Sequence, residues 1–208
     1  TVRAAFRGWT GFFNSKSYVN QLSGEQKVFY LASITSMAVF FSFMAVYSFA
    51  SLAKKTQMLA SMNKATPWLK LSMSGSSALY TTTNLMSDEN TMNLLRMETQ
   101  EKLNPLLPDD VKCVMVAEAM FKLRLEGKLE QKLSDIRTIQ ALKLVKDFLE
   151  VISITVGFSR MPYARQIKAS FAFCSGCLGV AATLFKAARD MESKKKENER
   201  AAAKTQGD

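Results

Sequence analysis

The longest uncharged run of the chain, residues 28–53, is apolar along almost its whole length. It reads VFYLASITSMAVFFSFMAVYSFASLA and is bounded by Lys27 on one side and by Lys54 and Lys55 on the other. As an α-helix its 26 residues reach roughly 39 Å, which exceeds the roughly 30 Å of a bilayer core. A helix in a soluble core usually carries a polar stripe, and this run has none. The pattern predicts a transmembrane helix, with a fully buried central helix or an uncleaved targeting segment as alternatives.

A second apolar run covers residues 169–185 between Lys168 and Lys186, with the sequence ASFAFCSGCLGVAATLF. Its 17 residues are close to the lower limit, about 17, for a helix that crosses a bilayer. The two flanking lysines can extend their ammonium groups toward water. This run is therefore either a second transmembrane helix or a helix buried among partner helices.

Both apolar runs carry small residues at helical spacing, which is typical of helices that pack closely in lipid. In the first run, large aromatic residues occupy the opposite side of the predicted helix. The predicted helix-packing positions are Thr35, Ala38, Ser42 and Ala45 in the first run, and Ser175, Gly176 and Gly179 in the second.

In the first 13 residues, apolar and basic positions recur at the helical period. Aromatic side chains therefore share one face of the predicted helix, and Arg3 and Arg7 lie on the opposite face. The aromatic residues are Phe6, Trp9, Phe12 and Phe13. This composition favours an interfacial helix that lies in the membrane plane; a short helix packed on a partner protein is the alternative. In the polar connector that follows, Ser23 and Gln26 predict a capping box at a helix start.

The rest of the chain is more polar. The Thr66-Pro67-Trp68 sequence predicts a helix break, and Gly75 and the threonines at 81–83 predict an irregular loop. One helix is expected from Ser87 to before Pro105, a longer one from Asp109 or Asp110 to about Lys132, and another from Ser134, which would cap it. The last two are expected to pair as a hairpin of about 50 residues, which is too small to bury a sufficient core alone.

These patterns divide the chain into six segments. They are an interfacial helix with its connector (1–27), a transmembrane helix (28–53), a linker (54–86), a helical extramembrane region (87–168), a second transmembrane or buried helix (169–185) and a charged tail (186–208). The predicted fold class is all-α: an integral membrane protein with one or two transmembrane helices, an N-terminal interfacial helix and a helical extramembrane hairpin. Four cations precede and four follow the first run within the adjoining segments, so the positive-inside rule assigns no orientation.

The chain has 28 Lys and Arg against 18 Asp and Glu, a net charge of +10 that is distributed along its length. Such a distribution suits contact with anionic lipids or acidic partner subunits. A nucleic-acid-binding protein more often shows a basic cluster with interleaved aromatic residues. We therefore expect membrane lipids and other subunits of a complex as partners, and neither nucleic acid nor a small-molecule substrate.

The sequence contains no histidine, which removes the commonest general base and the usual haem ligand. No phosphate-binding loop, dinucleotide fingerprint or nucleophile elbow occurs, and the apolar runs hold no charge that would mark an ion pathway. Cys174 and Cys177 form a C-x-x-C motif, but inside an apolar run where burial would raise the thiol pKa. We predict no enzyme activity, no metal and no cofactor apart from bound structural lipids.

The first 24 residues contain three cations and no acid, a bias typical of sequences around an organellar import cleavage site. Because the sequence starts at Thr1, either a preceding segment was removed or the chain is part of a longer protein. The leading hypothesis is a non-catalytic accessory subunit of a large organellar membrane complex, in the mitochondrial inner membrane or, alternatively, a plastid membrane. The other hypotheses are a membrane-shaping or lipid-binding protein, acting through segments 1–13 and 142–168, and a thiol redox protein.

Overall fold

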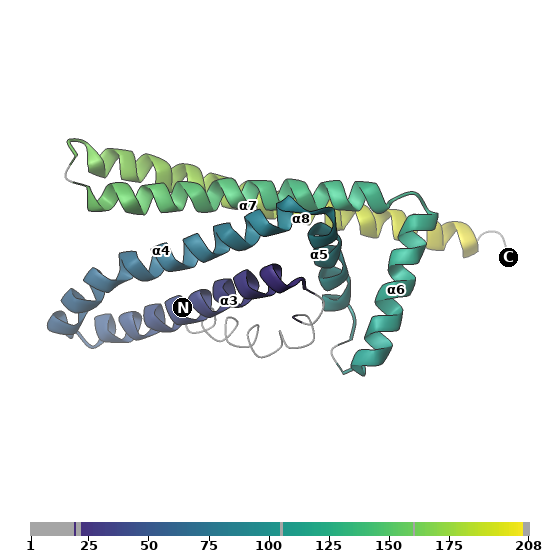
Figure 1. Cartoon of the computed structure of the whole chain (residues 1–208), viewed down its shortest axis with the longest axis horizontal. Helices are drawn as coiled ribbons and strands as arrows, with labels where there is room; N and C mark the ends of the chain where they lie inside the picture. The colour runs from purple at the N-terminus through teal and green to yellow at the C-terminus, as the bar shows by residue number, and fades with distance from the viewer. Residues whose placement is uncertain (1–18, 20–21, 105, 160, 206–208) are drawn as a thin grey trace.

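The structure, a computed structural model, describes residues 19, 22–104, 106–159 and 161–205 (Figure 1). This part of the chain is all-helical and contains no strand, as the sequence predicts. Its helices are α3 (Gly24–Leu52), α4 (Thr56–Met86), α5 (Asp88–Glu101), α6 (Asp109–Leu125), α7 (Leu129–Phe158) and α8 (Ala164–Thr205). The predicted interfacial residues Phe6, Trp9, Phe12 and Phe13 lie outside the described residues.

Two helical hairpins form the body of the molecule. Helices α3 and α4 run antiparallel and make the first hairpin, and α7 and α8 make the second (Figure 1). Helix α4 also packs along α7, so the four long helices follow one another in the order α3, α4, α7, α8. The tips of both hairpins lie at the same end of the molecule, and α5 and α6 lie at the other (Figure 1).

The predicted break and loop between residues 66 and 83 are wrong, because all these residues belong to α4. An internal proline costs a helix about 3 kcal/mol, and packing of α4 between α3 and α7 compensates for this cost. The hydroxyls of Thr82 and Thr83 donate to the carbonyls of Ala78 and Leu79 in the preceding turn. The threonines are thus accommodated by bonds to their own helix rather than by a loop.

The predicted pairing of residues 109–158 into a hairpin is also wrong. Gly127 adopts a positive φ of 66°, which glycine accepts at little cost. Helix α6 therefore ends at Leu125 rather than near Lys132, and α7 begins at Leu129, so Ser134 lies inside α7 and caps nothing. Helix α6 runs across the end of the layer, while α7 pairs with α8 (Figure 1).

The apolar core is small and lies where α5 and α7 meet, beside α6. Buried Leu95, Leu133 and Ile136 form its centre. The partly buried side chains packed against it are Met92, Leu94, Met120, Leu123 and Leu129. So small a core leaves most of the long helices to be stabilised by helix–helix contacts and by whatever surrounds the chain.

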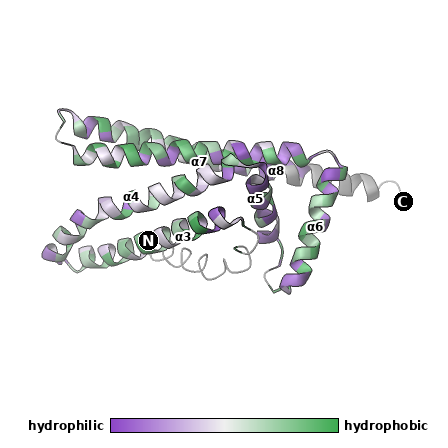
Figure 2. Cartoon of the chain, in the orientation of Figure 1, coloured by the Kyte–Doolittle hydropathy of each residue, from purple (hydrophilic) through white to green (hydrophobic). Residues whose placement is uncertain are grey.

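Two helices, α3 and the Ala164–Glu192 part of α8, are long and apolar enough to cross a membrane. Only 17% of the most apolar window of α3 and 11% of that of α8 are buried inside the structure. Large apolar side chains such as Phe49, Phe173 and Leu184 are consequently exposed. Figure 2 shows the contrast between the largely hydrophobic α3 and the hydrophilic α5.

Candidate functional site

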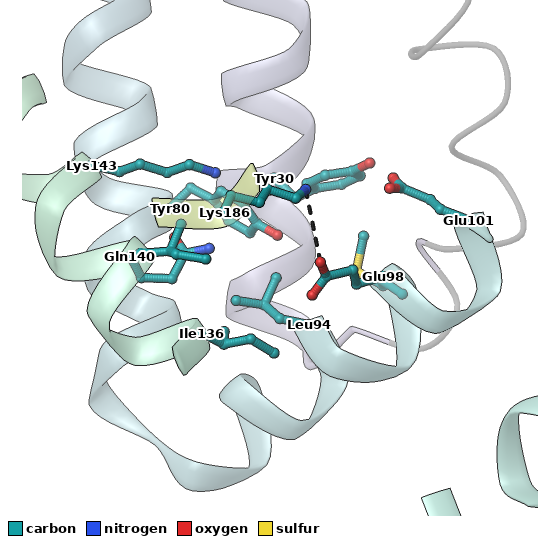
Figure 3. A pocket seen from close by; sticks show the side chains of 11 residues that line it. Tyr30, Tyr80, Leu94, Glu98, Glu101, Ile136, Gln140, Lys143 and Lys186 are labelled. Carbon is teal, nitrogen blue, oxygen red and sulfur yellow. Dashed lines mark ion pairs between the residues drawn. The ribbon is translucent and has the colours of Figure 1, made fainter. Parts of the chain in front are cut away.

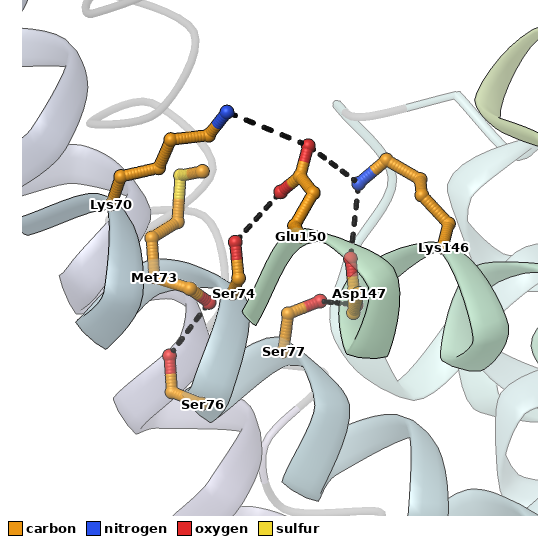
Figure 4. A network of polar contacts seen from close by, with 8 residues as sticks. All are labelled: Lys70, Met73, Ser74, Ser76, Ser77, Lys146, Asp147 and Glu150. Atoms are coloured by element: carbon orange, nitrogen blue, oxygen red, sulfur yellow. Dashed lines mark hydrogen bonds and ion pairs between the residues drawn. The ribbon is translucent and has the colours of Figure 1, made fainter. Parts of the chain in front are cut away.

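A polar seam joins α4 to α7 (Figure 4). The Ser74 hydroxyl donates to Glu150 Oε2 across 2.7 Å, and the Ser77 hydroxyl donates to Asp147 Oδ2 across 2.5 Å. Asp147 is only 4% exposed. A carboxylate so deeply buried needs hydrogen bonds or a cation to offset its lost hydration, and the serines of α4 supply the hydrogen bonds.

Two lysines neutralise the carboxylates of this seam. Lys146 Nζ lies 3.0 Å from Asp147 Oδ1 and 3.8 Å from Glu150 Oε1. Lys70 Nζ lies 3.8 Å from the same Glu150 oxygen, from the α4 side (Figure 4). Two ammonium groups and two carboxylates therefore make an electrically balanced network across the α4–α7 interface.

The seam lies level with part of each apolar run. Ser72, two residues before Ser74, faces Ser36 of α3 with 3.5 Å between their hydroxyl oxygens. Gly179 of α8 lies so close to the Lys146 stem that a β-carbon there would approach Lys146 Cδ to 3.5 Å. The apolar runs hold no charge, as the sequence shows, but the neighbouring helices bring charged groups to the same level. Sequence reasoning missed this because α4 and α7 were assigned to a linker and an extramembrane region.

A second polar cluster fixes the start of α3 to α4 and α5. Gln26 Nε2 donates to Asn84 Oδ1 across 2.7 Å and to the Asn90 carbonyl across 3.1 Å, and Asn93 Nδ2 donates to Gln26 Oε1 across 3.4 Å. Gln26 has no exposed surface. Ser23 is the N-cap residue, but its hydroxyl donates to Asn90 Oδ1 instead of capping the helix. The predicted capping box is therefore wrong, because both side chains are used by tertiary contacts.

A pocket of about 210 Å³ lies beside this cluster, between α3, α4, α5, α7 and α8 (Figure 3). The polar side chains that line it include Tyr30, Tyr80, Glu98, Glu101, Lys143 and Lys186. The rings of Tyr30 and Tyr80 meet at a tilt with 5.3 Å between their centroids. Lys186 Nζ lies 3.8 Å from Glu98 Oε1. This carboxylate is shared with Arg189, whose guanidinium lies 2.5 Å away.

The formal charges of the pocket lining balance, with Lys143 and Lys186 against Glu98 and Glu101. Among the described residues, Lys143 forms no ion pair. The pKa of its ammonium group is lowered mainly by partial desolvation and to a lesser extent by repulsion from Lys186. The Lys143 side chain nevertheless reaches solvent along part of its length. Arg189 is 9% exposed along its side chain, and its Nε and Nη1 atoms are buried with no partner in the described part of the chain.

The predicted helix-packing residues occupy different environments. In α3, Ala38 is fully buried, Ser42 and Ala45 are partly buried, and Thr35 is exposed. In α8, Ser175 is buried, Gly179 is partly buried against Lys146, and Gly176 is exposed. For the exposed positions, Thr35 and Gly176, packing against another protein stays a prediction.

The three cysteines, Cys113, Cys174 and Cys177, are free and exposed. The expected burial of Cys174 and Cys177 is thus wrong within this chain, because the apolar run that contains them faces outward over much of its surface. No group of three His, Cys, Asp or Glu side chains that could hold a metal ion occurs among the described residues.

Comparison with known proteins gives no relative: no protein-family model matches the sequence, and neither the curated proteins nor the solved structures include a significant match. The function must therefore be inferred from the chain itself.

Proposed function

We propose that the chain is a non-catalytic structural subunit of a large organellar membrane complex. The observation that carries this proposal is the distribution of polarity across the four long helices. Few residues in the apolar windows of α3 and α8 are buried, whereas Lys70 of α4 and Lys146 of α7 pair with carboxylates at the interface between the two hairpins. Lipid or neighbouring apolar helices are the surroundings that suit such an exterior.

Helix α6 supports a role in assembly. Only Val116 of this helix is buried, while Val114, Phe121 and Leu125 are among its exposed apolar side chains. Most helical stability in proteins comes from packing of one helix face, and α6 packs little of its surface within the described part of the chain. We infer that α6 packs against another subunit.

The mitochondrial inner membrane is our first candidate location, and a plastid membrane is the second. The basis is the acid-free stretch that precedes Glu25, with its cations Arg3, Arg7 and Lys16, which resembles sequence near an import cleavage site. The excess of cations over the whole chain also favours contact with anionic lipid or acidic subunits.

Membrane shaping gains little support. That hypothesis requires residues 142–168 to insert into a bilayer as an amphipathic segment, but residues 142–158 belong to α7, which packs against both α4 and α8. If the purified protein deforms liposomes without any partner, membrane shaping replaces our proposal.

The decisive experiment is mass spectrometry of the proteins that co-purify with the chain after mild detergent solubilisation of membranes. We expect a constant set of partner subunits, whose identity also establishes the organelle. A double variant of α6, Val114→Asp with Phe121→Asp, should lose those partners that contact this helix. Leu106→Asp introduces the same type of change at an exposed site before α6 and should retain them. Recovery of the wild-type chain as a lone monomer would contradict the proposal.

A further inference from the structure

We propose that the end of the molecule formed by the two hairpin tips docks on the anionic headgroups of a phospholipid bilayer. This end carries exposed cations from both hairpins, which we call the basic tips (Figure 1). They are Lys54, Lys55 and Lys64 of the first hairpin and Arg165 and Lys168 of the second. The inference rests on the membrane location proposed above, and it names the surface of the chain that meets a particular class of lipid.

The positive charge of the basic tips is not balanced within the described part of the chain. No Asp or Glu occurs in residues 28–87 or 151–189, the two stretches that contain the tips. The acid that precedes the second tip, Glu150, already pairs with Lys70 and Lys146. None of the five cations forms an ion pair among the described residues. An anionic partner is therefore the one that this surface attracts.

The opposite end of the molecule differs in charge. Residues 88–150, which include α5 and α6, contain 10 Lys and Arg against 12 Asp and Glu. Several of these charges pair with one another or with α8, as in the contacts of Arg137 with Asp88 and of Lys102 with Asp190. The tips, rather than the end that holds α5 and α6, are thus suited to an anionic lipid surface.

An aromatic contact brings the cations of the two hairpins together. The rings of Trp68 and Phe158 stack with 4.6 Å between their centroids and 24° between their planes. Lys64 precedes Trp68 by one helical turn, so both lie on the same face of α4. The Lys168 side chain lies beside Gly157, where a β-carbon would approach Lys168 Cδ to 3.2 Å. Each hairpin therefore places one cation next to the stacked rings.

The position of the basic tips relative to the apolar runs favours a lipid surface over an acidic protein. Lys54 directly follows the first apolar run, and Lys168 directly precedes the second. Few residues of either run are buried, so lipid that covers the runs brings its headgroups to the level of these lysines. Trp68 is 61% and Tyr163 73% exposed at the same end. Cations and exposed aromatic rings beside apolar helices are typical of the headgroup region of a bilayer.

The test uses the fluorescence of Trp68 in the full chain. The chain has two tryptophans, so Trp9→Phe leaves Trp68 as the reporter at the basic tips. The protein is reconstituted in vesicles of equal parts phosphatidylcholine and phosphatidylglycerol, in which one or the other lipid carries bromine atoms that quench tryptophan on contact. We expect brominated phosphatidylglycerol to quench Trp68 more strongly, because the cations retain the anionic headgroup. Added salt should weaken this preference.

Charge variants in the same Trp9→Phe background identify the source of the preference. Lys64→Gln with Lys168→Gln should lower the preference for phosphatidylglycerol about threefold or more. Lys122→Gln with Arg124→Gln removes the same charge from exposed positions of α6 and should leave the preference unchanged. Lys64→Arg with Lys168→Arg keeps the charge and should preserve it. A circular dichroism melt establishes that each variant is folded.

Equal quenching by the two brominated lipids, or an equal change in the tip and α6 variants, would overturn the proposal. If the Lys64→Gln, Lys168→Gln variant loses a co-purifying subunit while its lipid preference stays unchanged, the tips bind an acidic protein and the lipid assignment is wrong. Equal quenching for a chain that retains all its partner subunits overturns only this inference. A chain that prefers phosphatidylglycerol but is recovered from membranes as a lone monomer overturns only the proposed function.

Discussion

The side-chain amide of Gln26 donates a hydrogen bond to Asn84 Oδ1 across 2.7 Å, and the two residues are 58 positions apart in the chain. Gln26 is 0% and Asn84 1% exposed. Because the same amide also donates to the Asn90 carbonyl, one side chain connects the start of α3 to the end of α4 and to α5. Gln26 therefore fixes how the first hairpin meets the helices at its open end.

Replacing Gln26 by leucine should destabilise the fold. Gln26→Leu leaves the Asn84 side-chain oxygen and the Asn90 carbonyl buried without this donor, and each unsatisfied group costs about 1–3 kcal/mol. We expect the free energy of unfolding to fall by about 2–4 kcal/mol, measured by denaturant titration in detergent with circular dichroism. Gln57→Leu, at an exposed position in the first turn of α4, should change it by less than about 0.5 kcal/mol. Similar losses in the two variants would contradict the role assigned to Gln26.

The contact between Ser77 and Asp147 should be measurable as a coupling energy. In a double-mutant cycle of Ser77→Ala and Asp147→Asn, we expect about 1–2 kcal/mol of interaction, because hydrogen bonds to charged groups are stronger than neutral ones. Ser76 provides the matched control, since its hydroxyl donates to the Met73 carbonyl within its own helix. The cycle of Ser76→Ala with Asp147→Asn should give a coupling near zero, and an equal coupling for both serines would refute the assigned contact.

The cysteines report which parts of the chain face lipid. In intact membranes, a water-soluble maleimide should label Cys113 on α6 and leave Cys174 and Cys177 unlabelled. The latter two lie in the apolar run of α8, where lipid excludes both water and the water-soluble reagent. All three are exposed within the chain itself, so denaturation in detergent should make all three reactive. Labelling of Cys174 and Cys177 in membranes at the rate of Cys113 would show that this part of α8 faces water.

Glycine substitutions separate backbone strain from helix propensity. Gly127→Ala should destabilise the fold by about 1–2 kcal/mol, because the left-handed conformation is unfavourable for a residue with a β-carbon. At this position φ is 66°, and a β-carbon would meet no atom of a non-neighbouring residue within 4 Å, so the effect comes from the backbone alone. Gly75→Ala, inside α4 and equally unobstructed, should instead stabilise the fold by up to about 1 kcal/mol. Thermal unfolding of both variants measures the difference in sign, and a loss of stability in both would contradict the explanation.

The sequence by itself determined that the chain is helical and that two of its segments are long and apolar enough to cross a membrane. These are local properties: an uncharged run of 26 residues between lysines has few alternatives to an apolar helix, whatever surrounds it. Local reasoning failed at Pro67 and at the threonines of α4, because packing against α3 and α7 outweighs their intrinsic preference to interrupt a helix.

Only the tertiary structure decided how the polar groups of the chain are used. Ser23 and Gln26 have the spacing of a capping box, but their partners are residues of α4 and α5 more than 50 positions away. The seam of Ser77 and Asp147 and the pocket around Lys143 likewise join helices that are distant in the sequence. The helical period of a sequence shows which side chains share one face of a helix. It does not show which other helix packs against that face. The energy of a buried polar group depends on that partner, so the sites of this protein emerge only when its two hairpins pack together.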